Sequence, residues 1–585
     1  MRIVFSHSNA GEGQPGNRSG RRRPIQLRCE RFSCARFSCA LLWMVGTPAS
    51  AQMNLDRFFP PVAQQGTETT VTAEGKFPNW PPQVICDRDD VEVKAGKDSG
   101  KLSIRVADDA ADGVAWIRLY DEKSATGFVP VVIASAKVTE EKEPNDKRAD
   151  ANALTLPTVV AGRLSKGGDS DAYRVSLKSG QQLVASVTAS QVLKSPMDVV
   201  LQLTDTGGNV LIQSDDVRGL DPQIVYTAES EREFLLRIFA FPETPNSTVG
   251  FGGSAAFVYT LDVTTGPYLD HVAAADGSAT GSATGSATRS IVPYGYNLDR
   301  QAVVTRTDAT DIAPPVASLE NALGWSWLSE PFPGVKRILA DDEFDGELPT
   351  VFSGHLAKRK EIHRFTFLAN KGTKYRAEVR SKADGFLLDS KLTIADPKTG
   401  KVIASNDDAS RGSYDAAVEF TAKEEGDLDV QLSDMIDGFG PRHFFRLAIG
   451  KVEPGFQLTV AADHFTLSPG KPLEIPVAVS REGGFNGKIR VSVNGLPGDV
   501  TAEPVISEPK GGTAKSVKLK LIGAKGPGGQ AVIQFIGTPL DSDDKPAGDT
   551  INATHHLRAS VLLSEFWLTN PPDTTDTTST DKAKP

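Results

Sequence analysis

The chain has 585 residues and a formal net charge of −10, a length that corresponds to about three to five domains. Apolar residues make up 39% and charged residues 24%, which excludes a mostly disordered chain and a polytopic membrane protein. The acidic excess argues against a protein built to bind nucleic acid, and Cys86, the one cysteine after residue 51, excludes an intrachain disulfide in the body.

Residues 1–51 have the pattern of a secretory signal. A basic stretch at 21–36 is followed by the apolar run Phe37–Gly46. Ala49-Ser50-Ala51 then supplies the small residues of a cleavage site, which makes Gln52 the expected first mature residue. A buried apolar helix is the alternative, and the arginines on one side argue against it. No later run reaches the roughly 18 apolar residues that span a bilayer. The sequence therefore predicts a secreted or periplasmic protein without a transmembrane anchor.

After residue 51 the sequence indicates short strands. Runs such as Tyr173–Leu177, Leu183–Val187 and Val199–Leu203 are rich in branched apolar residues, and Gly, Asp and Asn separate them. This pattern is typical of β-sandwiches and barrels, and no long amphipathic helix is evident. The predicted fold class is all-β, with β-sandwich domains in tandem.

An internal repeat divides the body of the chain. Residues 198–216 and 389–408 share one order of Asp, strand, Gly turn, strand and Asp-Asp pair. Upstream, Tyr173–Leu177 matches His363–Phe367 when the two runs are aligned. We therefore expect two copies of one β-domain.

Further units surround these copies. Leu55-Asp56 before Val71–Gly75 has a counterpart in Leu269-Asp270 before Val292–Gly295, so a related unit precedes each copy. The Gly-Ser-Ala-Thr repeats at 277–288 indicate an inserted, flexible tip. The expected order is a signal peptide (1–51), an Ig-like domain (52–138), the first copy (139–266), an Ig-like segment with the insertion (267–340), the second copy (341–452), an Ig-like domain (453–565) and a disordered tail (566–585).

The first copy opens with Glu141-Lys-Glu143-Pro144-Asn145-Asp146, and Asp169-Ser-Asp171-Ala-Tyr173 follows. These motifs resemble the bacterial pre-peptidase C-terminal domain over about 125 residues. The resemblance implies a jelly-roll sandwich of the kind found in secreted peptidases and other exported proteins. The second copy departs from it, with Asp341–Asp345 at the opening and Glu361-Ile-His363 in place of Asp171-Ala-Tyr173.

The flanking units resemble Ig-like domains. The stretch Gly295–Leu298 is similar to the IPT/TIG type of Ig fold. The whole array resembles large exported proteins of planctomycete bacteria, which implies a function outside the cytoplasm.

Six side chains of the first copy are candidate calcium ligands. Ca²⁺ binds about six to eight oxygen atoms, and the acidic opening and the following turn supply carboxylate and amide oxygens. In the collagen-binding relatives of this domain family, the matching segments bind calcium and order the N-terminal linker, and the resemblance implies the same here. A metal-free turn, in which Asn and Asp bond their own backbone, is the alternative. The candidates are Glu141, Glu143, Asn145, Asp146, Asp169 and Asp171.

No residue set predicts catalysis. The run Gly168–Ala172 lacks the final glycine of a nucleophile elbow and precedes a strand, so we interpret it as an acidic turn. His555 and His556 would point to opposite faces of a strand, and no zincin, P-loop or dinucleotide motif occurs. Asp215-Asp216 and Asp407-Asp408 recur in both copies. We interpret them as turns, with a second cation site as the alternative.

The predicted function is that of an exported, non-catalytic binding or scaffold protein of the cell envelope or exterior. Its sandwich modules would present loops and a sheet face to an extracellular protein or polysaccharide. A secreted peptidase or peptidase-associated protein is one alternative, although no segment remains to hold a catalytic domain. A structural envelope spacer is the other.

Overall fold

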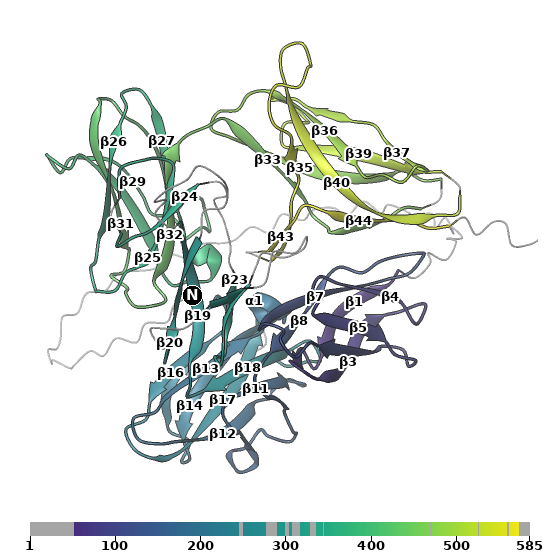
Figure 1. The fold of residues 1–585 in the computed structure, drawn as a ribbon, viewed down its shortest axis with the longest axis vertical. Coiled ribbons are helices and arrows are strands. Elements are labelled where there is room, and N and C mark those ends of the chain that lie inside the picture. Colours follow the sequence, from purple (N-terminus) through teal and green to yellow (C-terminus); the bar gives the residue numbers. More distant parts are fainter. Residues whose placement is uncertain are drawn as a thin grey trace, which may run out of the picture. The chain divides into compact units, whose positions relative to one another are not determined.

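The structure is a computed structural model that describes residues 52–244, 250–276, 289–298, 304–306, 316–327, 335–342, 344–468, 470–524, 526–558 and 561–572. Strands make up most of the described residues (Figure 1), so the all-β prediction is confirmed. The expected signal peptide and the Gly-Ser-Ala-Thr tip lie outside the described residues. Among the described helices, none has the length and apolar character needed to span a membrane.

The first domain is a sandwich of two four-stranded sheets. Its strands are β1 (Asn54–Phe59), β2 (Val62–Gln64), β3 (Glu68–Lys76), β4 (Gln83–Cys86), β5 (Val91–Ala95), β6 (Lys101–Val106), β7 (Gly113–Tyr120) and β8 (Val129–Ala134). The sheet orders are β1-β3-β6-β5 and β2-β8-β7-β4. Strand β6 alternates, burying Leu102, Ile104 and Val106 in the core between the sheets.

The first copy of the repeated domain is a sandwich of two five-stranded sheets. Its strands are β9 (Val138–Glu140), β10 (Asn152–Ala153), β11 (Thr158–Arg163), β12 (Asp171–Leu177), β13 (Gln182–Thr188), β14 (Met197–Asp205), β15 (Val210–Ser214), β16 (Gln223–Thr227), β17 (Arg232–Pro242) and β18 (Val258–Thr264). The orders are β10-β12-β17-β14-β15 and β16-β13-β18-β11-β9. A 3-10 turn (Arg148–Asp150) and helix α1 (Ser190–Leu193) complete it.

The second copy repeats this architecture. Its strands are β24 (Lys336–Leu339), β25 (Thr350–His355), β26 (His363–Ala369), β27 (Lys374–Arg380), β28 (Ser390–Ala395), β29 (Val402–Asn406), β30 (Ala417–Thr421), β31 (Gly426–Asp434) and β32 (Phe444–Lys451). The orders are β24-β25-β32-β27-β30 and β26-β31-β28-β29. Because β24 pairs in parallel with β25, as β9 does with β11, this sandwich begins at Lys336 rather than at residue 341.

A capping device occurs in both copies. The Asp221 carboxylate accepts the backbone N–H groups of residues 189–191 at the start of α1. The Asp415 carboxylate accepts those of residues 381–383, at the 3-10 turn Lys382–Asp384. A buried carboxylate thus satisfies the same unpaired donors in each copy.

The strand pairing corrects the sequence alignment of the copies by two residues. Strands β12 and β26 each have seven residues and pair with the equivalent strands β17 and β31. His363 therefore takes the place of Asp171, and Phe365 takes the place of Tyr173. The sequence alignment had instead matched His363 to Tyr173. A shift of two residues preserves the alternation of inward and outward side chains, so the apolar pattern does not reveal it.

A smaller unit lies between the copies. Its strands are β19 (Tyr268–Asp276), β20 (Arg289–Tyr296), β21 (Val304–Arg306), β22 (Val316–Leu319) and β23 (Trp325–Trp327). They form the pair β19-β20 and the sheet β21-β22-β23. Leu269 pairs with Gly295 as Leu55 pairs with Gly75, each beside a bulge, so the same strand pair precedes both copies.

The C-terminal domain contains strands up to Asn570. They are β33 (Gly455–Val460), β34 (His464–Thr466), β35 (Leu473–Glu482), β36 (Lys488–Asn494), β37 (Val500–Ala502), β38 (Val505–Ser507), β39 (Ser516–Gly523), β40 (Gly529–Leu540), β41 (Ile551–Asn552), β42 (His555–Arg558), β43 (Val561–Leu563) and β44 (Phe566–Asn570). Sheet β33-β35-β39-β37 faces a sheet of order β34-β44-β40-β36-β38, with β41 on β40, and β42 pairs with β43. The prediction that the tail starts at residue 566 was wrong, because Phe566 and Leu568 are buried in this core. The remainder of the expected tail, 573–585, lies outside the described residues.

Candidate metal centre

The acidic opening segment and the turn before β12 meet at one end of the first copy. The Ala172 backbone N–H donates to the carbonyl oxygen of Asn145 at 3.1 Å, which holds the opening segment against the start of β12. The turn before this strand contains Gly168 at φ +84°, a conformation that glycine adopts readily. Two stretches separated in sequence thus bring their side chains to one place.

Three carboxylates converge there. Glu143, Asp169 and Asp171 each place an oxygen within 4.8 Å of the other two. Asp169 and Asp171 are buried, while Glu143 is exposed. Buried like charges at this separation are unfavourable unless a proton or a cation neutralises them.

The side-chain amide of buried Asn145 lies between two of these carboxylates. When its nitrogen faces them, it donates to Glu143 Oε2 at 3.2 Å and to Asp171 Oδ1 at 3.0 Å. When its oxygen faces them instead, four side chains present oxygens to one point, which requires a cation among them. Asn145 can therefore serve the site in both the metal-free and the metal-bound form.

Asp169 has one oxygen that is satisfied and one that is not. Its Oδ2 accepts hydrogen bonds from the Ser165 N–H and hydroxyl and from the Lys166 N–H. Its Oδ1 is buried and has no hydrogen-bond donor among the described residues. A buried acceptor without a donor is costly, and a bound cation would satisfy it.

Two tyrosine hydroxyls lie behind the carboxylates. Tyr259 donates to Asp171 Oδ2, and the Tyr173 and Tyr259 hydroxyls are 2.6 Å apart. Tyr173 also reaches Glu141 Oε2 at 3.3 Å. Burial, together with the charge of Glu141, raises the pKa of Asp171 to about 9, and burial raises the pKa of Glu141 to about 7. Asp171 therefore holds a proton near neutral pH when no cation is present, and Glu141 titrates close to neutral pH.

The structure thus separates the six predicted ligands into two groups. Glu143, Asn145, Asp169 and Asp171 converge. Glu141 lies behind Asp171, where its Oε1 accepts the Arg163 N–H at 2.8 Å. Asp146 lies at the rim, where a side-chain hydrogen bond with Asp169 lowers its pKa. Its Oδ1 is 3.5 Å from the Ser170 nitrogen, and Lys166 Nζ is 3.8 Å from its Oδ2. Sequence reasoning missed Tyr259, which lies 88 residues from Asp171.

The donor set fits calcium better than other common metals. Four side chains supply only oxygen atoms, and exposed Glu143 leaves one side open to water. Calcium takes flexible all-oxygen shells completed by water, whereas zinc prefers His and Cys ligands and magnesium demands a near-octahedral shell.

The second copy has lost this arrangement except for its turn. Glu361 Oε2 accepts the N–H groups of Ala357 and Lys358, as Asp169 accepts those of Ser165 and Lys166. The ring of Phe445 contacts His363 with centroids 5.4 Å apart. The replacements at the matching positions are Ala340 for Glu141, His363 for Asp171, Phe365 for Tyr173 and Phe445 for Tyr259. The turn is thus a general feature of the fold, and the buried polar cluster is specific to the first copy.

A methyl group at Gly162 is expected to disturb the cluster. A Cβ atom at this position would overlap the ring and hydroxyl of Tyr259. Gly162→Ala should therefore lower the free energy of unfolding by about 1–3 kcal/mol and weaken cation binding, measured by denaturation with and without calcium. Gly354→Ala in the second copy, where the Cβ would press on Ala340, is the matched control. It should destabilise the protein without changing its response to calcium, and an equal effect of both substitutions on that response would contradict the role of Gly162.

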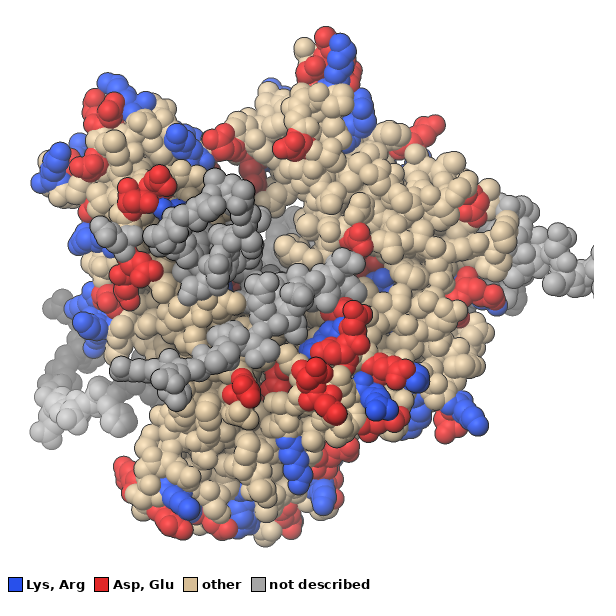
Figure 2. Space-filling view, viewed as in Figure 1, with Lys and Arg blue, Asp and Glu red and all other residues tan. Residues whose placement is uncertain are grey.

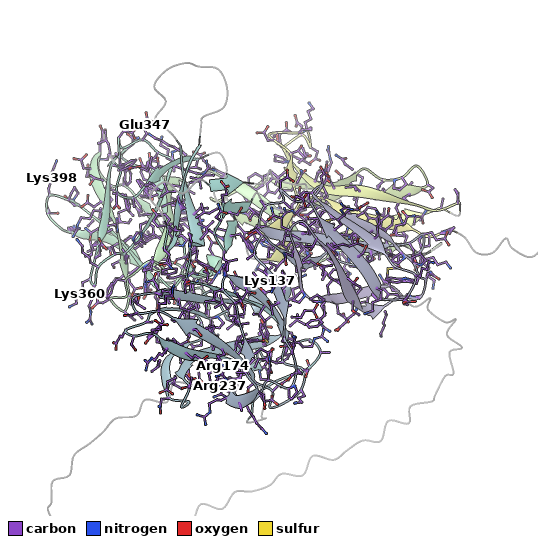
Figure 3. All side chains as sticks on the ribbon, turned by 60° about the horizontal axis from the view of Figure 1, so that its bottom comes forward. Lys137, Arg174, Arg237, Glu347, Lys360 and Lys398 are labelled. Atoms are coloured by element: carbon purple, nitrogen blue, oxygen red, sulfur yellow. The ribbon has the colours of Figure 1, made fainter. Side chains whose placement is uncertain are left out.

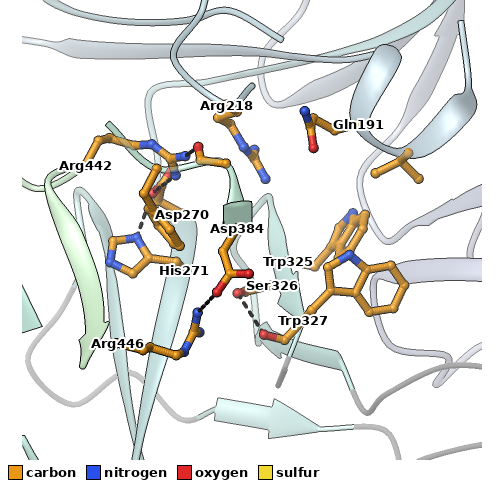
Figure 4. Close-up of a pocket in the computed structure, with 13 residues that line it drawn as sticks. Gln191, Arg218, Asp270, His271, Trp325, Ser326, Trp327, Asp384, Arg442 and Arg446 are labelled. Carbon is orange, nitrogen blue, oxygen red and sulfur yellow. Dashed lines mark hydrogen bonds and ion pairs between the residues drawn. The ribbon is translucent and has the colours of Figure 1, made fainter. Parts of the chain in front are cut away.

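A separate hollow of about 100 Å³ is lined mainly by paired charges (Figure 4), and the buried Nε2 of His271 there has no hydrogen-bond partner among the described residues. Asp270 pairs with Arg442 at 2.7 Å, and Asp384 pairs with Arg446 at 2.9 Å. Burial lowers the pKa of His271 to about 4, so this imidazole is neutral. The lining residues are Gln191, Val192, Arg218, Asp270, His271, Trp325, Ser326, Trp327, Asp384, Gly385, Phe386, Arg442 and Arg446.

No model of a known protein family matches the chain, and no curated protein matches its sequence. Three similar solved structures are β-domain proteins. The pre-peptidase C-terminal domain of a Bacillus anthracis collagenase is 19% identical, with 21% of this chain and 100% of that chain covered and a TM-score of 0.16. The periplasmic inhibitor of g-type lysozyme from Aeromonas hydrophila is 13% identical, with 20% and 96% covered and a TM-score of 0.15. Domains 1–6 of the surface layer protein SbsC are 10% identical, with 90% and 55% covered and a TM-score of 0.14. Similarity at this level does not assign a function.

Proposed function

We propose that this chain is an exported, non-catalytic scaffold or binding protein whose first repeated domain binds calcium. The observation that carries the proposal is the convergence of Glu143, Asp169 and Asp171 on one point, with an Asp169 oxygen that has no donor among the described residues. Charged side chains of both signs are spread over the face in Figure 2, an arrangement that gives no support to a nucleic-acid partner.

The position of the site supports a structural role for the cation. The ligands Glu143 and Asn145 belong to the segment that follows β9, directly after the first domain. Arg163 connects the two regions, because its backbone N–H donates to Glu141 and its guanidinium pairs with Glu74 of the first domain at 2.6 Å. Calcium would therefore hold the opening segment on the sandwich and stiffen the junction between the two domains.

The surroundings of Ser170 support a non-catalytic function. Its hydroxyl lies 3.5 Å from the carbonyl oxygen of Asp146, and strand β12 begins at the next residue. A serine nucleophile needs a base in hydrogen-bond reach and, in a nucleophile elbow, a helix behind it. The peptidase alternative would regain support if the protein cleaved casein or if a serine-directed probe labelled Ser170.

Calcium is expected to raise the melting temperature of the mature protein. At a calcium concentration of about 100 times the dissociation constant, the stabilisation should be about 2.7 kcal/mol, measured by calorimetry against an EDTA sample. Asp171→Asn should remove most of this response, because it takes away a buried ligand charge. Glu361→Gln changes the equivalent turn of the second copy and should leave the response intact.

Two results would contradict the calcium site. One is equal melting in EDTA and in millimolar calcium. The other is a calcium response that Glu361→Gln removes and Asp171→Asn retains.

Retention of the mature protein by isolated cell-wall material would favour a binder, and its absence would favour the envelope spacer.

A further inference from the structure

An apolar tip stands at one end of the second copy. We define this apolar tip as Ile362, Met435, Ile436 and Phe439, whose exposed fractions are 46%, 42%, 72% and 52%. Ile362 directly precedes strand β26, and the other three residues follow its partner strand β31. Large apolar side chains exposed together, rather than singly, indicate an interaction surface.

The loop that carries this tip is held in place by a buried carboxylate. Asp434 Oδ1 accepts the N–H groups of Ile436 and Gly438, each at 2.8 Å, and its Oδ2 accepts the Asp389 N–H at 3.0 Å. Gly438 packs so closely on His443 that a Cβ atom there would overlap the imidazole ring. The fold therefore fixes the loop while its apolar side chains point into solvent.

A basic loop lies beside the apolar tip. The Leu356 N–H donates to the carbonyl oxygen of His443 at 3.1 Å, and the Gly440 N–H donates to that of Leu356 at 2.7 Å. These bonds place the exposed run Lys358-Arg359-Lys360 against the loop of Ile436 and Phe439. Lys360 projects outward at this end of the domain, away from Lys398 (Figure 3).

This basic loop keeps most of its charge. Lys360 Nζ is 4.0 Å from Asp437 Oδ2, the outer limit of an ion pair. Glu361 already accepts two backbone N–H groups. Among the described residues, no ion pair involves Lys358 or Arg359. Without the eight arginines and two glutamates of residues 1–51, the chain carries a net charge of −16, so three consecutive exposed basic residues contrast with the rest of the protein.

We propose that the apolar tip and the basic loop dock the second copy on an anionic lipid surface. Ile436 and Phe439 would enter the boundary between headgroups and acyl chains, and Lys358, Arg359 and Lys360 would face the lipid phosphates. Apolar residues flanked by basic ones bind such surfaces, because burial and electrostatic attraction add together. A protein partner would need an apolar groove ringed by acidic residues, whereas every anionic bilayer offers both features.

Vesicle binding of the mature protein tests this docking. In EDTA, the protein should sediment with vesicles of equal parts phosphatidylglycerol and phosphatidylcholine. It should sediment far less with vesicles of phosphatidylcholine alone. Ile436→Ser with Phe439→Ser should weaken binding by about tenfold or more. Lys358→Glu with Lys360→Glu should weaken it similarly and reduce its salt dependence. The matched control, Val402→Ser with Ile403→Ser, removes two other exposed apolar side chains of the same domain and should bind normally.

A direct readout distinguishes insertion from loose adsorption. Phe439→Trp should show blue-shifted emission with anionic vesicles, because the indole leaves water. Four results would each overturn the proposal. Two of them are absence of sedimentation with vesicles and equal binding to both vesicle types. The other two are normal binding of the Ile436/Phe439 double variant with unchanged melting, and binding that requires calcium. The EDTA condition separates this surface from the metal site, so either proposal can fail while the other holds.

Discussion

The calcium-free protein is expected to lose stability as the pH rises from about 5 to about 9. Burial raises the pKa of Asp171 to about 9 and that of Glu141 to about 7, so the folded state keeps protons that the unfolded state releases. Stability from such groups is fully present below the unfolded pKa and is lost as the pH passes the folded pKa. The loss should be several kcal/mol, because each unit of pKa shift corresponds to about 1.4 kcal/mol, and urea denaturation in EDTA at several pH values measures it.

Calcium should remove most of this pH dependence. A cation among Glu143, Asp169 and Asp171 favours the ionised carboxylates and lowers their pKa values, so the bound state holds fewer protons. The stabilisation by calcium should therefore grow with pH, and calcium binding near neutral pH should release protons that calorimetry in buffers of different ionisation enthalpy detects.

The variant Asp171→Asn separates the pH dependence of the carboxylate cluster from that of other buried acids. Burial also raises the pKa of Asp262 to about 7 and that of Asp221 to about 6, and these groups add slopes of the same sign. Asp171→Asn leaves both in place, so its pH dependence in EDTA should be flatter than that of the wild type but not absent. Identical slopes in the two proteins would show that the carboxylate cluster does not carry the effect.

The candidate site could be predicted from sequence where its residues are close along the chain. Glu143 and Asn145 lie two residues apart, as do Asp169 and Asp171. The resemblance to the pre-peptidase C-terminal domain predicted that the two pairs belong to one site. The contribution of Tyr259 to the site could not be predicted, because Tyr259 lies on β18 and reaches the site only when β18 pairs with β11. The apolar pattern around Tyr259 indicates only a strand.

The repeat was predictable in its existence and not in its register. The match between residues 198–216 and 389–408 identified two copies, because paired turns and strands recur there. The alignment of His363 with Tyr173 failed, because alternation fixes which face a side chain takes but not which of two same-face positions it occupies. The end of the last domain was missed for a related reason: Phe566–Asn570 is too short to indicate a strand until β34 and β40 supply its partners.

Replacing Arg118 by Met is expected to lower the free energy of unfolding by about 3–5 kcal/mol. Arg118, on β7, donates to Asp463 Oδ2 at 2.6 Å across 345 residues of sequence, and both side chains are buried. The guanidinium also lies 3.9 Å from the centre of the Phe128 ring. Methionine would keep apolar contact there but would take the guanidinium away from the buried Asp463 carboxylate, which would keep only His464 and the Phe128 N–H as partners. Urea denaturation should show the loss.

The pH dependence and a double variant distinguish an unpaired charge from lost packing. Burial raises the pKa of Asp463, but the hydrogen bond to His464 and the charge of Arg118 outweigh it and hold that pKa well below its usual value. Its stabilising contribution is therefore present above the unfolded pKa and is lost in acid, so the difference between wild type and Arg118→Met should shrink as the pH falls. Adding Asp463→Leu should recover most of the loss, because no charge remains buried. If the double variant were as unstable as Arg118→Met, packing around Phe128 rather than the ion pair would join the first and last domains.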